Sequence, residues 1–231
     1  MTYVMSDLHG MYDKFIIMLK KIDFSDSDEL FIIGDIIDRG KRPVDILEYV
    51  MDKPNITVLL GNHEVMARDL LSRLTTEITE ENINSVDDDF LIELSIYKRN
   101  GGATTMKQLR ALPPIKRKEI IDFIDSLYAY EAIDIGDKTF VLVHAGLGNF
   151  RKDKKISEYS LYELLELRPD YERQYFDDDS VYIVSGHTPT KLISGKWEIY
   201  HSHNNIVIDC GAAFGGRLAC LRLEDMAEFY V

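Results

Sequence analysis

The stretch Gly34-Asp35-Ile36-Ile37-Asp38-Arg39-Gly40 places two carboxylates and a guanidinium within five residues. Carboxylates bind hard cations, and a planar guanidinium pairs bidentately with phosphate oxygens. The apolar run Phe31-Ile32-Ile33 before it is typical of a buried parallel strand that opens into a loop, which is where open α/β sheets bind ligands. Alone, the stretch could be an ordinary surface turn with an ion pair. The residues that follow the other predicted strands decide between these interpretations.

Four further strand ends carry polar residues of the same kind, each beside a glycine. These are Asp7 with His9, Asn62 with His63, His144, and His187. Histidines kept for packing would not all fall at the same structural position. Nitrogen and oxygen ligands in this mixture suit Mn, Fe or Zn better than Ca, and the absence of cysteine argues against a structural zinc site. A single aspartate can bridge two ions about 3.5–4 Å apart, which is the geometry of two-metal phosphoester hydrolysis.

Strand, loop and helix alternate three times in the first third of the chain. Apolar runs predict strands at 2–5, 30–33 and 56–60, and helical spacing of apolar residues predicts helices at 12–22, at 43–51 and from the third loop to 74. Such repeats favour parallel strands with right-handed crossovers. The polar loops would then meet at one edge of a sheet.

A helical excursion at about 75–127 separates these units from the later strands. Its acidic start, 75–89, is expected to be a solvated face to which we assign no function, with Asp87-Asp88-Asp89 as a helix cap. The sequence Asn100-Gly101-Gly102 predicts a turn. Because strands resume directly afterwards, we expect one domain over residues 1–231.

The second half is rich in strands, many of them antiparallel. A hairpin with a two-residue turn is predicted at 130–135 and 138–143, and further strands at 181–184, 197–200, 206–208 and 218–223. One helix is predicted at 157–167 with Ser157 as its N-cap. Trp197 is interpreted as a core or rim residue.

Composition describes a globular chain and limits its partners. The 231 residues are 45% hydrophobic, with 27 Lys and Arg against 40 Asp and Glu and a formal net charge of −13. This balance disfavours nucleic acid and anionic membranes, whose binding depends on clustered Lys and Arg. Cys210 and Cys220 form no repeated metal or disulfide pattern and are typical of a reducing cytosol. With no signal-like or membrane-length apolar segment, we expect a cytoplasmic protein.

The motifs together resemble those of the calcineurin-like metallophosphoesterases. They are Asp7-x-His9-Gly10, Gly34-Asp35-x-x-Asp38-Arg39-Gly40, Gly61-Asn62-His63-Glu64, His144-Ala145-Gly146 and Gly186-His187-Thr188-Pro189. Within that family the pattern looks most like the phosphoprotein phosphatase branch, in its compact bacterial and phage lambda form. One such motif is weak evidence, but five in family order across the chain are very specific.

The resemblance implies a fold and a metal centre. The fold would be α/β, a four-layer α/β/β/α sandwich with two mixed sheets and helices outside. Two divalent ions would be bound, Mn first and Fe or Zn as alternatives. One ion would be held by Asp7, His9 and the bridging Asp35, and the other by Asp35, Asn62, His144 and His187.

The resemblance also implies roles for four residues around the ions. Arg39 and Arg168 would hold the phosphate, and His63, oriented by Asp38, would protonate the leaving group. Arg168 follows Leu164-Leu165-Glu166-Leu167, where the family form has an aromatic residue in place of Glu166 or Leu167. The assignment of Arg168 therefore depends on a motif that differs from the family form.

These features lead to a function and its alternatives. The expected activity is two-metal hydrolysis of phosphomonoesters by metal-activated hydroxide, on phosphoserine and phosphothreonine of proteins or peptides. The alternative is a dinucleoside polyphosphate hydrolase, acting for example on diadenosine tetraphosphate, which shares all these motifs and cleaves an anhydride. A metal-binding scaffold without catalysis would have lost a ligand or the Asp38–His63 pair, and both are intact. A nuclease is disfavoured by the acidic balance.

Overall fold

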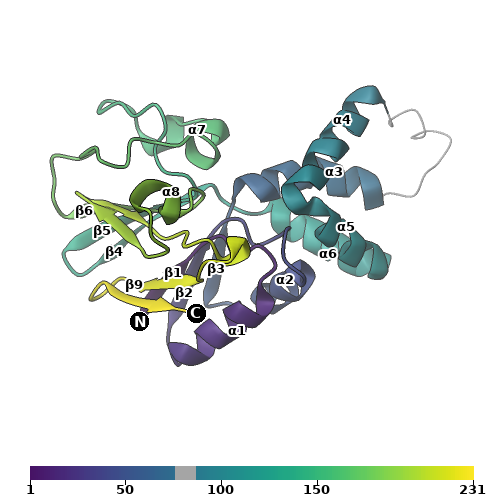
Figure 1. Cartoon of the computed structure of the whole chain (residues 1–231), viewed down its shortest axis with the longest axis horizontal. Helices are drawn as coiled ribbons and strands as arrows, with labels where there is room; N and C mark the ends of the chain where they lie inside the picture. The colour runs from purple at the N-terminus through teal and green to yellow at the C-terminus, as the bar shows by residue number, and fades with distance from the viewer. Residues whose placement is uncertain (76–86) are drawn as a thin grey trace.

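Two mixed five-stranded sheets form the body of the protein (Figure 1), in a computed structural model that describes residues 1–75 and 87–231. The first sheet has the order β10-β9-β1-β2-β3. Its strands are β1 (Thr2–Met5), β2 (Glu29–Ile33), β3 (Ile56–Leu59), β9 (Ala219–Arg222) and β10 (Ala227–Tyr230). Strands β1, β2 and β3 are parallel, whereas β9 is antiparallel to both β1 and β10.

The second sheet has the order β4-β5-β6-β8-β7. Its strands are β4 (Tyr130–Ile135), β5 (Lys138–Val143), β6 (Val181–Ser185), β7 (Tyr200–Ser202) and β8 (Asn205–Val207). Strands β5, β6 and β8 are parallel, and the hairpins β4–β5 and β7–β8 close the two edges. The polar loops after β5 and β6 therefore leave the sheet at the same end.

Alternation along the strands divides the apolar residues among three cores, because successive side chains point to opposite faces of a sheet. The core between the two sheets includes Val4, Phe31, Ile33, Phe140, Leu142 and Val184. The core under the helices of the first sheet includes Met5, Phe15, Ile32 and Leu47. The third core includes Val141, Val143, Ile183, Leu164 and Leu165. Three cores separate four layers, so the predicted α/β/β/α sandwich is confirmed.

Helices cover the outer faces and extend to one side. α1 (Tyr12–Lys21) and α2 (Pro43–Met51) lie on the first sheet, and α7 (Leu161–Leu165) and α8 (Thr190–Ser194) lie on the second (Figure 1). The helices α3 (Asn62–Thr75), α4 (Asp88–Tyr97), α5 (Ala103–Ala111) and α6 (Pro114–Asp125) form a bundle beside the sandwich, in which α3 contacts both α4 and α6. Short helical turns occupy Lys98–Gly102, Ile156–Glu158 and Ala212–Phe214.

Several local predictions need correction. The helix predicted at 157–167 is only Leu161–Leu165, and its N-cap is Ser160, whose hydroxyl accepts from the Glu163 N–H. A strand predicted at 197–200 begins at Tyr200 instead. Helix α5 and strand β10 were not predicted, and the expected turn at 100–102 is a kink that joins α4 to α5. Most of the acidic stretch predicted at 75–89 lies outside the described residues.

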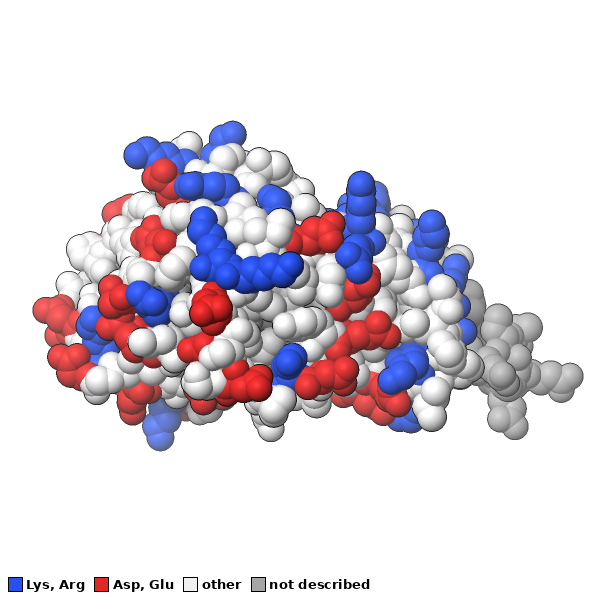
Figure 2. All heavy atoms as spheres, turned by 90° about the horizontal axis from the view of Figure 1, so that it is seen from below, with Lys and Arg blue, Asp and Glu red and all other residues white. Residues whose placement is uncertain are grey.

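Surface charge and helix length bear on the expected partners. On the face seen in Figure 2, basic and acidic side chains are interspersed over most of the surface. Within the described parts of the chain, no helix is both long enough and apolar enough to cross a lipid bilayer.

Candidate active site

The loops after β1, β2, β3, β5 and β6 meet at one end of the sandwich, where hydrogen bonds join the two sheets. The His187 N–H donates to Asp7 Oδ2 at 2.9 Å, and the His144 imidazole Nδ1 lies 2.9 Å from the Ile33 carbonyl oxygen. Each bond joins a loop of the second sheet to the first. The predicted ligands therefore converge, although they come from all parts of the sequence.

Most of these loop residues adopt a left-handed backbone. Positive φ angles occur at Asp7, His9, Asp35, Asp38, Arg39 and His187. Residues other than glycine seldom adopt this conformation, and such backbone strain concentrates at functional sites. Asp and His are among the residues that tolerate it best, so the residue types at these loops suit both the backbone and the expected chemistry.

Asp35 lies at the middle of the group, with one carboxylate oxygen toward each side. Its Oδ2 is 3.4 Å from His9 Nε2, and its Oδ1 is 3.4 Å from His144 Nε2. The carboxylate is buried, and Oδ1 also accepts from the His63 N–H at 3.0 Å. A carboxylate with this placement can bridge two cations.

Lone pairs converge on the space around Asp35. His144 Nδ1 faces a backbone carbonyl and must carry the proton, which leaves the lone pair of its Nε2 directed at Asn62 Oδ1, 3.0 Å away. His187 Nδ1 lies 3.0 Å from the same amide oxygen. His9 repeats the arrangement, with Nδ1 3.0 Å from the Ile37 carbonyl and Nε2 toward Asp35. Such backbone contacts fix the tautomer of metal-binding histidines.

The donor set fits divalent cations. Burial and the charge of Arg39 lower the pKa of His9 well below its usual value, and burial lowers that of His187 to about 3, so both imidazoles are neutral and can donate lone pairs. Burial raises the pKa of Asp35 well above its usual value, which a bound cation would reverse. The clustered ligand atoms are His9 with Asp35 and His63, and Asp35 with His144 and His187, in each group within 4.8 Å of one another.

Asp7 is placed beside the first of these groups. Its Oδ1 is 3.9 Å from His9 Nε2, while Oδ2 accepts the His187 N–H. His63 is less available as a ligand, because its Nδ1 donates to Asp38 Oδ2 at 2.7 Å and its Nε2 lies 2.9 Å from the Arg39 guanidinium. The geometry therefore favours Asp7 over His63 as a ligand of the ion near His9.

The predicted pair of His63 and Asp38 is present and is held by residues that the sequence did not single out. Asp38 is fully buried, and its Oδ1 accepts from the Tyr97 hydroxyl at 2.7 Å and the Thr105 hydroxyl at 2.6 Å. Burial lowers the pKa of His63, but the charge of Asp35 and the hydrogen bond to Asp38 outweigh it, so the pKa is raised. The structure thus favours a protonated His63.

We expect Tyr97→Phe to lower the free energy of unfolding by about 1.5–3 kcal/mol, because the buried carboxylate of Asp38 loses one of its donors. Urea denaturation measures this change. Tyr175→Phe is the matched control, since that buried hydroxyl donates to a neutral carbonyl, Asp170 O, at 2.8 Å. Its expected loss is about 0.5–1.5 kcal/mol. Equal losses in the two variants would contradict a special role of Tyr97 toward Asp38.

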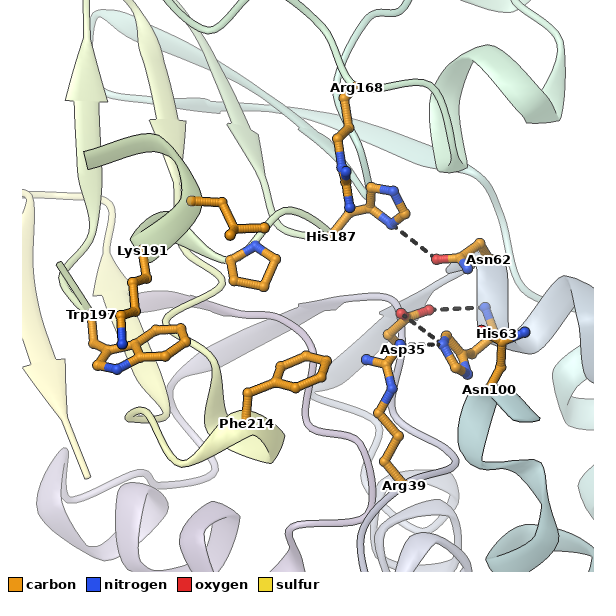
Figure 3. A pocket seen from close by; sticks show the side chains of 12 residues that line it. Asp35, Arg39, Asn62, His63, Asn100, Arg168, His187, Lys191, Trp197 and Phe214 are labelled. Atoms are coloured by element: carbon orange, nitrogen blue, oxygen red, sulfur yellow. Dashed lines mark hydrogen bonds and ion pairs between the residues drawn. The ribbon is translucent and has the colours of Figure 1, made fainter. Parts of the chain in front are cut away.

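Two arginines face each other across a cavity of about 450 Å³ beside the ligands (Figure 3). Arg39 extends from the first sheet toward Asp35, and its guanidinium contacts His9 Nε2 as well as His63. Arg168 lies beside the His187 imidazole on the opposite wall. Both arginines therefore line the cavity that adjoins the predicted ligands.

Glu64 is a residue whose position sequence reasoning left without a role. Its buried carboxylate accepts from the N–H groups of Asp35, Ile36 and Gly61, at 2.8, 2.9 and 3.0 Å. It therefore ties the loop after β2 to the loop after β3. Its place in the first turn of α3 looks like ordinary helix capping in the sequence, so only the spatial partners reveal this function.

Close packing explains two of the motif glycines. A Cβ at Gly61 would lie 2.3 Å from Asp35 Oδ1, and a Cβ at Gly186 would lie 2.2 Å from Asp7 Oδ2. Real side chains do not approach so closely, so any other residue would displace a predicted ligand. These two glycines, visible in the sequence motifs, are therefore required by the site itself.

A family model for calcineurin-like phosphoesterases matches residues 2–220. The chain therefore belongs to the calcineurin-like phosphoesterase family, a class of metal-dependent hydrolases, as the motifs predicted. Its resemblance to the narrower phosphoprotein phosphatase branch stays a prediction.

Individual relatives add detail. The chain is 27% identical over 256 residues to the asymmetrical bis(5′-nucleosyl)-tetraphosphatase PrpE of Geobacillus sp. (strain WCH70), covering 99% of this chain and 92% of the relative. A solved structure provisionally described as a diadenosine tetraphosphatase matches with a TM-score of 0.67 at 15% identity, over 100% of this chain and 92% of that one. A protein serine/threonine phosphatase from Saccharomyces cerevisiae matches with a TM-score of 0.56 at 14% identity, over 100% of this chain and 78% of that one.

Proposed function

We propose that this protein hydrolyses a phosphoanhydride bond of a dinucleoside polyphosphate, such as diadenosine tetraphosphate, with two divalent ions. This reverses the order of the two activities expected from the motifs, where protein phosphatase stood first. The observation that carries the proposal is the cavity beside the ligands, whose lining combines the cations Arg39, Arg168 and Lys191 with two aromatic rings, Trp197 and Phe214. The relatedness to PrpE tetraphosphatases over nearly the whole chain supports it.

The aromatic wall of the cavity suits a nucleoside. Trp197 and Phe214 both line it, with the Lys191 amine 5.0 Å from the indole centroid and the Arg39 guanidinium carbon 4.8 Å from the phenyl centroid (Figure 3). Stacking of a base on an aromatic ring is worth about 1–3 kcal/mol. A phosphoserine peptide has no comparable flat group next to its phosphate, so this wall favours a nucleotide.

The residues that would hold the ions are those predicted from the motifs. Asp7, His9 and Asp35 would hold one ion, and Asp35, Asn62, His144 and His187 the other. Manganese is our first choice, with iron or zinc as alternatives. When bound, such an ion pair supplies a hydroxide nucleophile at neutral pH and neutralises charge on the phosphate oxygens.

The chain's own residues would position the phosphate and manage the leaving group. Arg39 and Arg168 can pair with non-bridging oxygens from opposite sides, which stabilises the charge that develops during in-line displacement. His63, kept protonated by Asp38, can deliver a proton to the departing oxygen. A nucleotide phosphate departs readily without that proton, so its reaction depends on the arginines more than on His63.

The second candidate remains a protein serine/threonine phosphatase, and the His63–Asp38 pair is the observation that favours it. A serine alkoxide is a poor leaving group and needs an acid. The structural likeness to the yeast phosphatase concerns the fold alone. A non-catalytic scaffold is the least favoured function, since the ligand groups and this pair are all in place.

A substrate comparison tests the proposal. On Mn-loaded wild type, we expect kcat/KM for diadenosine tetraphosphate to exceed that for a phosphoserine peptide by at least about fivefold, since one stacked base contributes about 1–3 kcal/mol. Phe214→Ala should raise KM for the dinucleotide about fivefold or more and leave that for the phosphoserine peptide nearly unchanged. Tyr162→Ala removes a similarly exposed aromatic ring (58% against 52%) from another layer and is the control. Preference for the phosphopeptide would establish the second candidate instead.

A further inference from the structure

A second cavity, of about 390 Å³, adjoins the first and shares Arg39 with it. It lies between the loops after β1 and β2, beside the turn at Ala212–Phe214. We propose that this cavity binds the leaving half of the substrate, a nucleoside triphosphate, while the first cavity holds the nucleoside whose phosphate is attacked. The proposal rests on the function proposed above and adds a binding site to it.

The charge of this cavity is opposite to that of the chain. Its lining contains four cations, Lys14, Arg39, Lys41 and Arg42, and one carboxylate, Asp13. The protein as a whole carries a formal net charge of −13. Such a local positive field attracts a polyanion, and bound substrate phosphates would be its natural counter-charge.

The cations divide into those engaged by the protein and one that is available. The Lys14 amine donates to the carbonyls of Ala212 and Gly216 at 3.1 and 2.8 Å, which anchors the turn that carries Phe214. Lys41 is exposed, and no partner of its amine is seen among the described residues. Because Lys41 follows Arg39 by only two residues, it can extend the phosphate contact from the first cavity into the second.

A flat platform forms part of the cavity wall. The Arg42 guanidinium carbon is 4.1 Å from the Tyr12 ring centroid, and the guanidinium is held by Asp13 at 3.0 Å and Asp45 at 2.7 Å. These carboxylates neutralise the arginine, so it is better suited to stacking than to binding phosphate. Paired tyrosine and arginine planes are a surface on which nucleobases stack.

The floor of the cavity is backbone that is fixed to the ion site. The Gly40 N–H donates to the His9 carbonyl at 2.8 Å, and the Arg42 N–H donates to the Gly10 carbonyl at 3.0 Å. The loops after β1 and β2 are thereby joined directly beside the predicted ligand His9. A phosphate chain that leaves the ions past Arg39 therefore enters a cavity lined by Lys41 and the Tyr12–Arg42 pair.

The reaction balances with this placement. Water oxygen forms a bond to the phosphorus next to the first nucleoside, and the bond from that phosphorus to the bridging oxygen breaks. The bridging oxygen and its electron pair leave with the other three phosphates, so the products are a nucleoside monophosphate and a nucleoside triphosphate. Two unequal products require two unlike subsites, as the two cavities are.

Product inhibition tests the site without needing the dinucleotide to be a substrate. Hydrolysis of p-nitrophenyl phosphate is followed with Mn²⁺ in excess, and Ki is measured for ATP, tripolyphosphate and AMP. In Lys41→Glu we expect the ratio of Ki for ATP to Ki for AMP to rise about tenfold. The Ki for tripolyphosphate should rise together with that for ATP. In Tyr12→Leu we expect the Ki for ATP to rise about fivefold, while the Ki for tripolyphosphate stays at its wild-type value.

Lys20→Glu is the matched control for Lys41→Glu, because it changes the net charge by the same amount. Lys20 is exposed and lies on α1, about 12 Å along the helix axis from Tyr12. The ratio should keep its wild-type value there. Equal ratios in Lys41→Glu and Lys20→Glu would overturn the proposed site. Failure of wild type to cleave diadenosine tetraphosphate, with the Lys41 effect present, would overturn the proposed function but leave the triphosphate site standing.

Discussion

Replacing Asp35 by asparagine is expected to remove both ions together and to lower kcat/KM by at least ~10³-fold for every phosphate substrate. The reason is that its two carboxylate oxygens face His9 and His144 separately, each at 3.4 Å, so one charge serves both sides of the site. An amide keeps the shape and the hydrogen bond from the His63 N–H but loses the charge that attracts the cations. Elemental analysis after Mn²⁺ loading and desalting should give well under one ion per chain.

Two comparisons separate this loss from misfolding. In EDTA, Asp35→Asn should unfold at the wild-type temperature or above it, because burial raises the pKa of Asp35 and the amide has no charge to desolvate. In Mn²⁺, only wild type should gain thermal stability. Asp28→Asn changes another buried carboxylate, paired with the N-terminus at 2.8 Å, and should retain metal and activity. Two tightly bound ions in Asp35→Asn would refute the bridging role.

Replacing His63 by asparagine is expected to have an effect that depends on the leaving group. General acid catalysis typically contributes ~10²–10⁴-fold, so a loss of that size is expected on a phosphoserine peptide, whose alkoxide needs a proton. On diadenosine tetraphosphate and p-nitrophenyl phosphate the loss should be much smaller. Steady-state kinetics on the three substrates, with metal content measured in parallel, give the result. An equal loss on all three would mean that His63 serves position or metal binding.

The raised pKa of His63 also predicts how activity on the phosphopeptide changes with pH. Because the pKa of His63 is raised above its ordinary value of 6.5, the acid stays protonated through the lower pH range, and activity on the phosphopeptide falls as pH rises through that raised pKa. Asp38→Asn removes a hydrogen bond and a charge that raise the pKa, so the fall should move to lower pH. His201→Asn, at an exposed histidine paired with Glu228, should leave the profile unchanged.

The choice between two activities shows where motif reasoning reached its limit. The motif residues gather around the ions and the attacked phosphate, and that part of the chemistry is the same for an ester and for an anhydride. Substrate class depends on the cavity walls, where Trp197, Phe214 and Lys191 lie outside the motifs that carried the resemblance. Trp197, interpreted from sequence as core or rim, is a half-buried residue that lines this cavity.

The sequence by itself determined the fold class and the composition of the site. Short apolar runs ending in glycine and a polar residue define parallel strands and their loops, because strand burial and loop backbone are local properties of a few neighbouring residues. Parallel topology then brings Asp7, Asp35 and Asn62 to one sheet edge, so their convergence followed from pattern alone. The match of the family model over residues 2–220 agrees with that reasoning.

Only the tertiary structure decided how the site is supported. Tyr97 and Thr105 reach Asp38 from helices 59 and 67 residues further along the chain, and Glu64 accepts from a loop 27 to 29 residues before it. In the sequence these are ordinary helix residues, since their spacing encodes which face of a helix is buried and not what that face meets. Contacts of this kind exist only after the helices dock, because the partner of a buried hydroxyl or carboxylate is set by packing between distant segments.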